Sequence, residues 1–285
     1  MDTTRFIIPC IRAALDAGIA ARKIYDQDFT VEKKADDSPI TLADRRSHAI
    51  IKASLKNFQI PVLSEEGRAI AYDQRSGWEY LWIVDPLDGT KEFVKKNGEF
   101  TINIALVQHG APVMGVIYVP ITRMLYFAEQ TMGAFRFDLH DKMDGENENA
   151  GFFDYDLSSL LDTAEKLPVK QNPDRPYTVV GSRSHSTDEL VSFVEEIKKE
   201  HADARFISAG SSLKFCLVAE GAADIYPRLG PTMEWDTAAG DLIARASGAV
   251  VFAYDSQISF RQGAKNPLVY NKENLLNPWF VVMRK

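Results

Sequence analysis

The chain contains 285 residues, of which 45% are hydrophobic and 26% charged, and its formal net charge is −7. This length allows a substantial buried core in one large domain or two smaller ones, and no apolar run approaches the roughly 20 residues that span a bilayer. The acidic balance disfavours a nucleic-acid polymer as partner, because binding to a polyphosphate needs clustered Lys and Arg. It leaves open a small phosphorylated ligand held through divalent cations.

The first 25 residues predict an amphipathic helix, with Ile7, Ile11, Ala14, Leu15 and Ile19 on one face. This segment lacks the basic start, continuous apolar stretch and cleavage site of a secretion signal. Cys10 and Cys216 are the only cysteines, which is too few for a disulfide framework and fits a reducing compartment. We therefore expect a cytoplasmic protein.

The rest of the first half predicts a helix followed by a sheet. A second helix is expected over residues 43–57, after the polar connector KADDSPIT. Residues 79–84 form a short apolar run that ends at Asp85-Pro86, which is typical of a buried strand opening into a loop. Residues 101–137 contain four apolar segments separated by turn residues, as expected of an antiparallel meander.

Beyond Pro176 the pattern changes to an alternation of strands and helices, which predicts a layered α/β arrangement. The expected strands are residues 177–182, 204–208, 223–228 and 249–254, and the expected helices are residues 187–200, 211–221 and 236–247. Between the two halves, DKMDGENENA has no periodicity and predicts an exposed loop. We therefore expect an N-terminal subdomain over residues 1–140, an acidic connecting region over 141–170 and a C-terminal subdomain over 171–285.

The segment WIVDPLDGT indicates metal chemistry. A strand would deliver Asp85, and a turn started by proline would deliver Asp88, so that two hard oxygen ligands converge. Gly89 allows a backbone path that a side chain would obstruct, which could bring the Leu87 carbonyl and the Thr90 hydroxyl to the same point. Mg2+ prefers such ligands. The alternative is that both aspartates only cap a turn.

Two further acidic clusters lie at the ends of predicted elements. Glu65 and Glu66 follow the apolar run IPVL, where adjacent like charges are unfavourable without a cation or solvent. Asp236 lies at the expected start of a helix of small residues, a position that suits either an N-cap or a site for phosphate. Each cluster has an ordinary structural explanation, and their joint presence favours a metal site.

The order of these clusters resembles the inositol monophosphatase superfamily of metal-dependent phosphatases, through SEEG, WIVDPLDGT and WDTAAGD. Within it, KADDSPITLAD, DPLDGTKEFVKKNGEFTINIAL and GSSLKFCLVAEGAADIYPRLGPTMEWDTAAG are similar to 3'(2'),5'-bisphosphate nucleotidases of the bacterial CysQ type. The similarity covers most of the chain. The acidic stretch over about 138–166 is longer than that family's compact bacterial pattern. No HExxH, GxSxG, P-loop or dinucleotide glycine motif is present.

The resemblance implies hydrolysis of 3'-phosphoadenosine 5'-phosphate to AMP and phosphate, with possible action on its sulfated relative, in sulfur assimilation. It also implies two or three Mg2+ ions, inhibition by lithium and an α-β-α-β-α layered fold with two subdomains. Peripheral association with the inner membrane surface would be compatible with the family, but no amphipathic basic helix or lipidation motif supports it. The oligomeric state is not predicted.

Carried over to this chain, the resemblance implies particular site residues. The metal ligands would be Glu65, Asp85, the carbonyl of Leu87, Asp88 and Asp236. Asp44 and Thr90 would position and deprotonate the attacking water, with Glu65 as a third catalytic residue; Asp44 could otherwise be a helix N-cap. The substrate would contact Glu65, Leu87, Asp88, Gly89, Thr90 and Asp236, together with Ser211, Ser212, Lys214, Arg228 and His185, and more weakly Ser182 and Arg183.

Other readings remain open from the sequence. Lys214 could be a solvated lysine on an amphipathic helix, and Arg228 a residue at a strand end. The motifs that bind the metal do not separate a nucleotidase from an inositol or sugar phosphatase, although Lys214 and Arg228 favour a substrate with a second anionic group. An inactive phosphonucleotide sensor would bind without turnover, and a structural calcium site would stabilise the chain without releasing phosphate.

Overall fold

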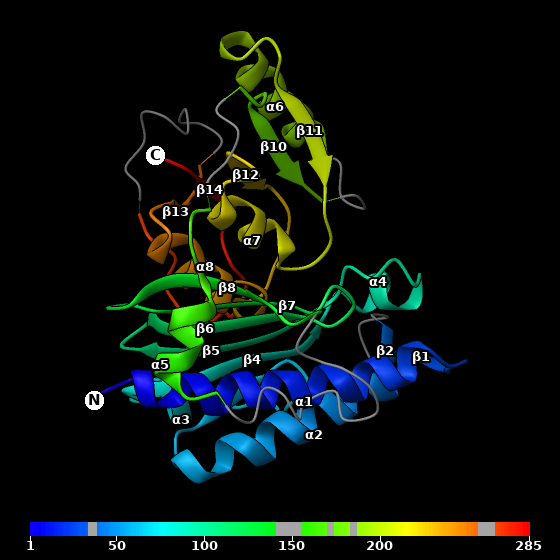
Figure 1. Ribbon diagram of the computed structural model, residues 1–285, viewed down its shortest axis with the longest axis vertical. Coiled ribbons are helices and arrows are strands. Elements are labelled where there is room, and N and C mark those ends of the chain that lie inside the picture. The colour runs from blue at the N-terminus through cyan, green and yellow to red at the C-terminus, as the bar shows by residue number, and fades with distance from the viewer. Residues whose placement is uncertain (34–38, 141–154, 170–173, 183–186, 256–265) are drawn as a thin grey trace.

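The computed structural model describes residues 1–33, 39–140, 155–169, 174–182, 187–255 and 266–285. Their elements stack in five layers, helix, sheet, helix, sheet and helix, which confirms the predicted α-β-α-β-α class (Figure 1). Among the described helices, none combines the length and apolar character that a membrane span requires.

The first layer contains two helices that pack on one face of the larger sheet (Figure 1). They are α1 (Ile7–Tyr25), preceded by the 3-10 turn η1 (Thr4–Phe6), and α2 (Leu42–Leu55), followed by η2 (Lys56–Phe58). Ile7, Ile11, Ala14 and Leu15 are buried as predicted, whereas Ile19 is only partly buried. The short hairpin β1 (Val31–Lys33) and β2 (Pro39–Thr41) joins the two helices.

Within the described residues the larger sheet has seven strands, in the order β3-β4-β5-β6-β7-β8-β9. They are β3 (Val62–Ser64), β4 (Tyr80–Asp88), β5 (Thr101–Gln108), β6 (Ala111–Val119), β7 (Met124–Glu129), β8 (Gly133–Asp138) and β9 (Glu165–Lys166). Strands β5 to β8 form the predicted antiparallel meander. The short helices α3 (Tyr72–Arg75) and α4 (Thr90–Val94) flank β4 in the sequence, and α5 (Leu157–Thr163) precedes β9.

The central helical layer contains α7 (Leu213–Glu220) and α8 (Ala238–Ala246), which lie between the two sheets (Figure 1). The second sheet has five strands among the described residues, in the order β11-β10-β12-β14-β13. They are β10 (Thr178–Gly181), β11 (Arg205–Ser208), β12 (Ile225–Arg228), β13 (Val250–Ala253) and β14 (Phe280–Met283). Helix α6 (Asp188–Glu200) covers the outer face of this second sheet and forms the fifth layer.

The structure differs from the sequence-based expectations at several places. Strand β4 extends to Asp88 instead of ending at Val84, and α8 begins at Ala238, two residues after Asp236. Strand β14 was not predicted and lies between β12 and β13. The expected connecting region is described over 155–169, where it contains α5 and β9; residues 141–154 lie outside the described part. The subdomain boundaries at residues 140 and 171 stay a prediction.

Close packing of α7 against α8 joins the two sheets. A Cβ atom on Gly240 would lie 2.5 Å from Cγ of Phe215, whose ring also stacks on Phe280 of β14 at 5.6 Å between centroids. Interior packing leaves no room for an added methyl group at this distance, and overpacking typically costs about 1–3 kcal/mol.

We therefore expect Gly240→Ala to lower the free energy of unfolding by about 1–3 kcal/mol, because Phe215 would have to leave its packed position. Urea denaturation measures this change. The matched control is Gly77→Ala, since no described atom lies within 4 Å of its added Cβ; it should change stability by no more than about 0.5 kcal/mol. Equal stability of the two variants would contradict the packing argument.

Candidate active site

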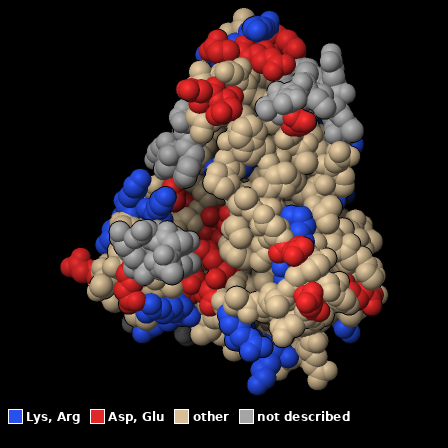
Figure 2. All heavy atoms as spheres, turned by 180° about the vertical axis from the view of Figure 1, so that it is seen from behind, with Lys and Arg blue, Asp and Glu red and all other residues tan. Residues whose placement is uncertain are grey.

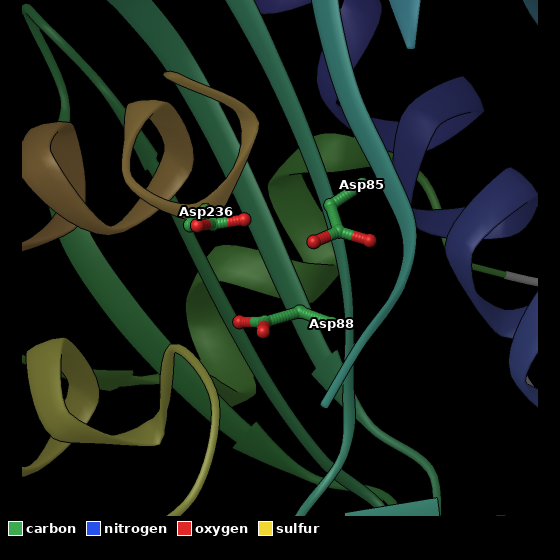
Figure 3. Close-up of side chains that lie close together, drawn as sticks. All are labelled: Asp85, Asp88 and Asp236. Atoms are coloured by element: carbon green, nitrogen blue, oxygen red, sulfur yellow. The ribbon is translucent and has the colours of Figure 1, made fainter. Parts of the chain in front are cut away.

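Two aspartates at the end of β4 and a third from a distant part of the chain point toward one another (Figure 3). One carboxylate oxygen from each of Asp85, Asp88 and Asp236 lies within 4.8 Å of the others. Asp85 and Asp88 belong to β4, where the pairing with β5 shifts register between them. Because alternate residues of a regular strand face opposite sides, residues three apart could not converge without such an irregularity.

Glu65 reaches the same place from the neighbouring strand. Strands β3 and β4 are parallel, with Ser64 opposite Val84, and the amide of Glu65 donates a hydrogen bond to the Val84 carbonyl at 3.2 Å. The residue after β3 therefore lies beside Asp85, the residue after Val84. Glu65 is half-buried, and its charge acts on both Asp85 and Asp236.

This crowding of like charges shifts the proton affinity of the carboxylates. Burial raises the pKa of Asp85 well above its usual value, and the charges of Glu65, Asp88 and Asp236 raise it further. Burial, followed by the charge of Asp88, raises the pKa of Asp236 to about 8. Acidic side chains also gather in a hollow near the middle of the molecule when it is seen from behind (Figure 2). The donor set fits a divalent cation, which would compensate these charges.

Hydrogen bonds from Ser212 and Asn103 fix the carboxylate of Asp88. The Ser212 hydroxyl lies 2.8 Å from Oδ2 of Asp88 and 2.8 Å from the Asp236 carbonyl, and it accepts a hydrogen bond from Asn103 at 2.9 Å. Asn103 also reaches Asp88 at 3.3 Å. The sequence analysis did not single out Asn103, although an amide within the apolar run INIAL is the signal that could have found it.

Asp44 and Thr90 meet as the resemblance implied. The Thr90 hydroxyl donates to Oδ1 of Asp44 at 3.0 Å, while Oδ2 accepts from the amide and the hydroxyl of Thr41 at 2.7 and 2.6 Å. Thr41 is the N-cap of α2, and Asp44 is the third helical residue of its capping box. The alternative reading of Asp44 as the N-cap itself is therefore wrong.

The acidic cluster borders a cavity whose other side carries two cations. Asp88, Gly89, Ser211 and Asp236 line it together with Glu92, Ser182, Gly210, Lys214, Phe215, Tyr226, Arg228, Thr232 and Thr237. Lys214 is only 5% exposed, so its reading as a solvated surface lysine is wrong. Burial lowers the pKa of Lys214 to about 8, although the charge of Asp88 opposes the fall.

The donors of both cations are only partly used by the protein. Lys214 donates to the carbonyls of Ala209 and Ser211 at 3.2 and 2.5 Å, which leaves its third proton for a ligand in the cavity. Arg228 donates to the Pro231 carbonyl at 2.7 Å, and its buried Nε has no hydrogen-bond partner within the described residues. The cavity can therefore bind an anionic group beside the acidic cluster.

Ser211, which the resemblance places at the substrate, makes its hydrogen bonds within the protein. Ser211 donates toward the carbonyls of Asp88 and Glu99, at 2.8 and 2.6 Å, so its proton already has protein acceptors. Its hydroxyl would lie 2.1 Å from a Cβ on Gly89, which has φ of +91°.

The Leu87 side chain is buried in an apolar cluster, leaving only its backbone for a ligand role. Arg183 and His185 lie outside the described residues.

Comparison with known proteins agrees with this geometry. Residues 2–279 match the model of the inositol monophosphatase family. The chain belongs to the inositol monophosphatase family. Enzymes of this family are metal-dependent, and the cluster of Asp85, Asp88 and Asp236 could bind the metal.

Individual members of the family are similar over nearly the whole chain. The chain is 41% identical to the 3'(2'),5'-bisphosphate nucleotidase CysQ of Salmonella typhimurium, covering 94% of this chain and 96% of that protein. Identity to the protein of the same name from Escherichia coli K12 is 40% over the same shares. The crystal structure of CysQ from Bacteroides thetaiotaomicron has a TM-score of 0.85 and 47% identity, and covers 100% of this chain and 98% of that one.

The raised pKa values predict how the metal-free protein responds to pH. A carboxyl group with a higher pKa in the folded protein binds more protons when folded, so stability falls as pH rises from the unfolded pKa of 3.8 toward the folded value of about 8 for Asp236. The melting temperature in chelator should therefore fall between pH 6 and pH 8.5. Asp236→Asn should lessen the fall, because that variant has no proton to lose there.

Thermal unfolding of both proteins across this range tests the prediction. The comparison isolates Asp236, because Lys214, whose lowered pKa acts in the opposite sense, is present in both. Added Mg2+ should restore the stability of the wild type at high pH, since the cation replaces the lost protons. An identical decline in wild type and Asp236→Asn would show that the acidic cluster does not cause it.

Proposed function

We propose that the chain is a 3'(2'),5'-bisphosphate nucleotidase that hydrolyses 3'-phosphoadenosine 5'-phosphate to AMP and phosphate with Mg2+. One observation carries the proposal: Asp88 and Asp236 of the acidic cluster line the same cavity as the buried cation Lys214. Such a site suits a substrate with two separated anionic groups. The names of the similar CysQ proteins support the same substrate. The proposal extends to the 3'-phosphate of the sulfated relative, to sulfur assimilation and to a cytoplasmic location.

In this proposal Glu65, Asp85, Asp88, Asp236 and the carbonyl of Leu87 would hold two or three Mg2+ ions. When bound, Mg2+ supplies positive charge that activates water and neutralises the phosphoryl oxygens. The chain itself contributes the fixed positions of these oxygens. Ser212 and Asn103 orient Asp88, and the hydrogen bond from the Met233 amide at 2.8 Å orients Asp236.

Thr90 and Asp44 would handle the proton of the attacking water. Because the Thr90 hydroxyl donates its proton to Asp44, its lone pairs remain to accept a hydrogen bond from water. Thr41 fixes the other oxygen of Asp44 through two hydrogen bonds, so the carboxylate cannot rotate away. As the water attacks phosphorus and the bond from phosphorus to the ribose 3'-oxygen breaks, the proton of the water can pass through Thr90 to Asp44, and the leaving oxygen can take up a proton from solvent.

The cationic side of the cavity would bind the phosphate that is not cleaved. Lys214 and Arg228 line the cavity that Asp88 and Asp236 also line. A nucleotide with phosphates at both ends of its ribose could therefore place one group on the acidic cluster and the other on the cations. Inositol monophosphate has no second phosphate for these donors.

The test is phosphate release from 3'-phosphoadenosine 5'-phosphate with and without Mg2+, for wild type and Asp88→Asn. We expect Mg2+-dependent release, inhibited by lithium, and a loss of at least about 100-fold in the variant, because a ligand oxygen loses its charge. The exposed Asp162 of α5 gives the matched control, Asp162→Asn, which should keep full activity.

Other outcomes of the same assay would assign other functions. Equal or greater release from inositol monophosphate would indicate an inositol phosphatase. Binding of the nucleotide without any release would indicate an inactive sensor. Stabilisation by calcium with no phosphate release from either compound would indicate a structural metal site.

A substitution at Lys214 tests which phosphate the cations bind. We expect Lys214→Met to lower kcat/KM for 3'-phosphoadenosine 5'-phosphate by about tenfold to 100-fold, as for a lost charge-assisted hydrogen bond. Hydrolysis of 3'-AMP, which lacks the 5'-phosphate, should change much less. The ratio of the two kcat/KM values is the measurement, and Lys214→Arg should retain part of the preference. An equal loss on both substrates would place Lys214 at the scissile phosphate or in folding alone.

A further inference from the structure

A second polar cluster lies behind the acidic site and takes no part in the proposed chemistry. Its centre is Glu234, which is fully buried. The Glu234 carboxylate accepts hydrogen bonds from the amides of Asn271 and Lys272 at 2.6 and 3.0 Å, and it pairs with Nζ of Lys272 at 2.6 Å. A buried carboxylate is costly unless it is paired and hydrogen-bonded, and Glu234 has both kinds of partner.

This carboxylate fixes the turn that carries Asp236. Glu234 begins the 3-10 turn η4 (Glu234–Asp236), and its own amide donates to the Leu275 carbonyl at 3.0 Å. Asn277 donates to the Met233 carbonyl at 2.8 Å and to the hydroxyl of Thr237 at 3.0 Å. Residues 271–277 therefore hold η4 on both sides of Asp236.

The same segment is tied to the region that follows Glu65. Arg75, at the end of α3, is 2% exposed and lies between Glu65 and β4 in the sequence. Its guanidinium donates to Oδ1 of Asn271 and to the carbonyls of Lys272 and Glu273, at 2.9, 2.7 and 3.0 Å. Asn271 returns a hydrogen bond to the Arg75 carbonyl at 2.8 Å. The turn at 271–273 thus contacts both Arg75 and Glu234.

Repulsion between the carboxylates of the acidic cluster explains why Asp236 needs this support. Without a cation, Asp85, Asp88 and Glu65 repel Asp236, which lies on a separate part of the chain and could move away with η4. We propose that Glu234, Lys272 and Arg75 are positioning residues that hold Asp236 in place for the metal before the metal binds. This inference rests on the proposed metal site. Supporting residues around metal ligands commonly change affinity by about 10- to 100-fold when they are replaced.

The alternative is that the cluster only stabilises the fold, and the chain offers a matched control. Arg175 and Asp224 form another partly buried, two-pronged pair, at 2.6 and 2.7 Å. They lie before β10 and β12, at the ends opposite Ser182 and Arg228, which line the cavity. Loss of this pair removes a comparable interaction far from the acidic cluster.

The experiment compares the full-length double variants Glu234→Gln/Lys272→Met and Asp224→Asn/Arg175→Met, each of which replaces an ion pair by neutral side chains of similar shape. Calorimetric titration of Mg2+ into the metal-free proteins gives the dissociation constant without any substrate. We expect this constant to rise by about tenfold or more in the first variant and to stay within about twofold in the second. Thermal unfolding measures the loss of stability in both.

Two results would overturn the inference. An unchanged Mg2+ dissociation constant in Glu234→Gln/Lys272→Met would mean that the pair only stabilises the fold. Equal weakening in both double variants would mean that general destabilisation lowers the affinity. If the first double variant does not fold, Glu234→Gln alone is measured, because its amide oxygen can still accept from one of the two backbone amides, and Lys272→Arg should keep the wild-type constant.

Failure of the proposed function gives a different result. A wild type that binds Mg2+ but releases no phosphate from 3'-phosphoadenosine 5'-phosphate would reject the nucleotidase function, and the calorimetric comparison would still decide the role of Glu234. A wild type that binds no Mg2+ would overturn the metal site and the positioning role together.

Discussion

Repulsion among carboxylates that share a small, partly buried volume is the constraint on which the site depends. Burial raises the free energy of the ionised forms of Asp85 and Asp236, and the charges of Asp88 and Glu65 raise it further. The folded chain alone cannot remove this cost. It can only fix the carboxylates and leave room for a cation, so the rest of the fold is a framework that resists their separation.

A different kind of interaction fixes each of the carboxylates. Sheet pairing fixes Asp85 and Glu65, since β3 ends at Ser64 opposite Val84 of β4. The hydroxyl of Ser212 joins Asp88 to the backbone of Asp236, and so connects the larger sheet to the start of α7. The ion pair between Glu234 and Lys272 restrains η4. A cation would therefore meet ligands from two layers of the molecule, the larger sheet and the turn that precedes α8.

The sequence predicted those structural features that are determined by residues close together in the chain. The meander and the motif with Asp85 and Asp88 follow from turn residues and a characteristic spacing, whereas the order of the five layers was implied by the resemblance to the family. Glu234 was not found, because its partner Lys272 lies 38 residues away and each side chain alone reads as an ordinary surface charge. The burial of Lys214 also depends on packing against the second sheet, which a helical pattern does not contain. Likewise, the register shift of β4 depends on its partner strand.

The position of β14 constrains the order in which the second sheet can form. Phe280–Met283 pairs with β12 on one side and β13 on the other, although these four residues are made after both partners. Until they emerge from the ribosome, β12 and β13 each present an unpaired edge of buried, apolar residues, which is the kind of surface that other chains join. The second sheet can therefore be completed only after Phe280–Met283 is available, whereas the meander of the first sheet can pair as it is made.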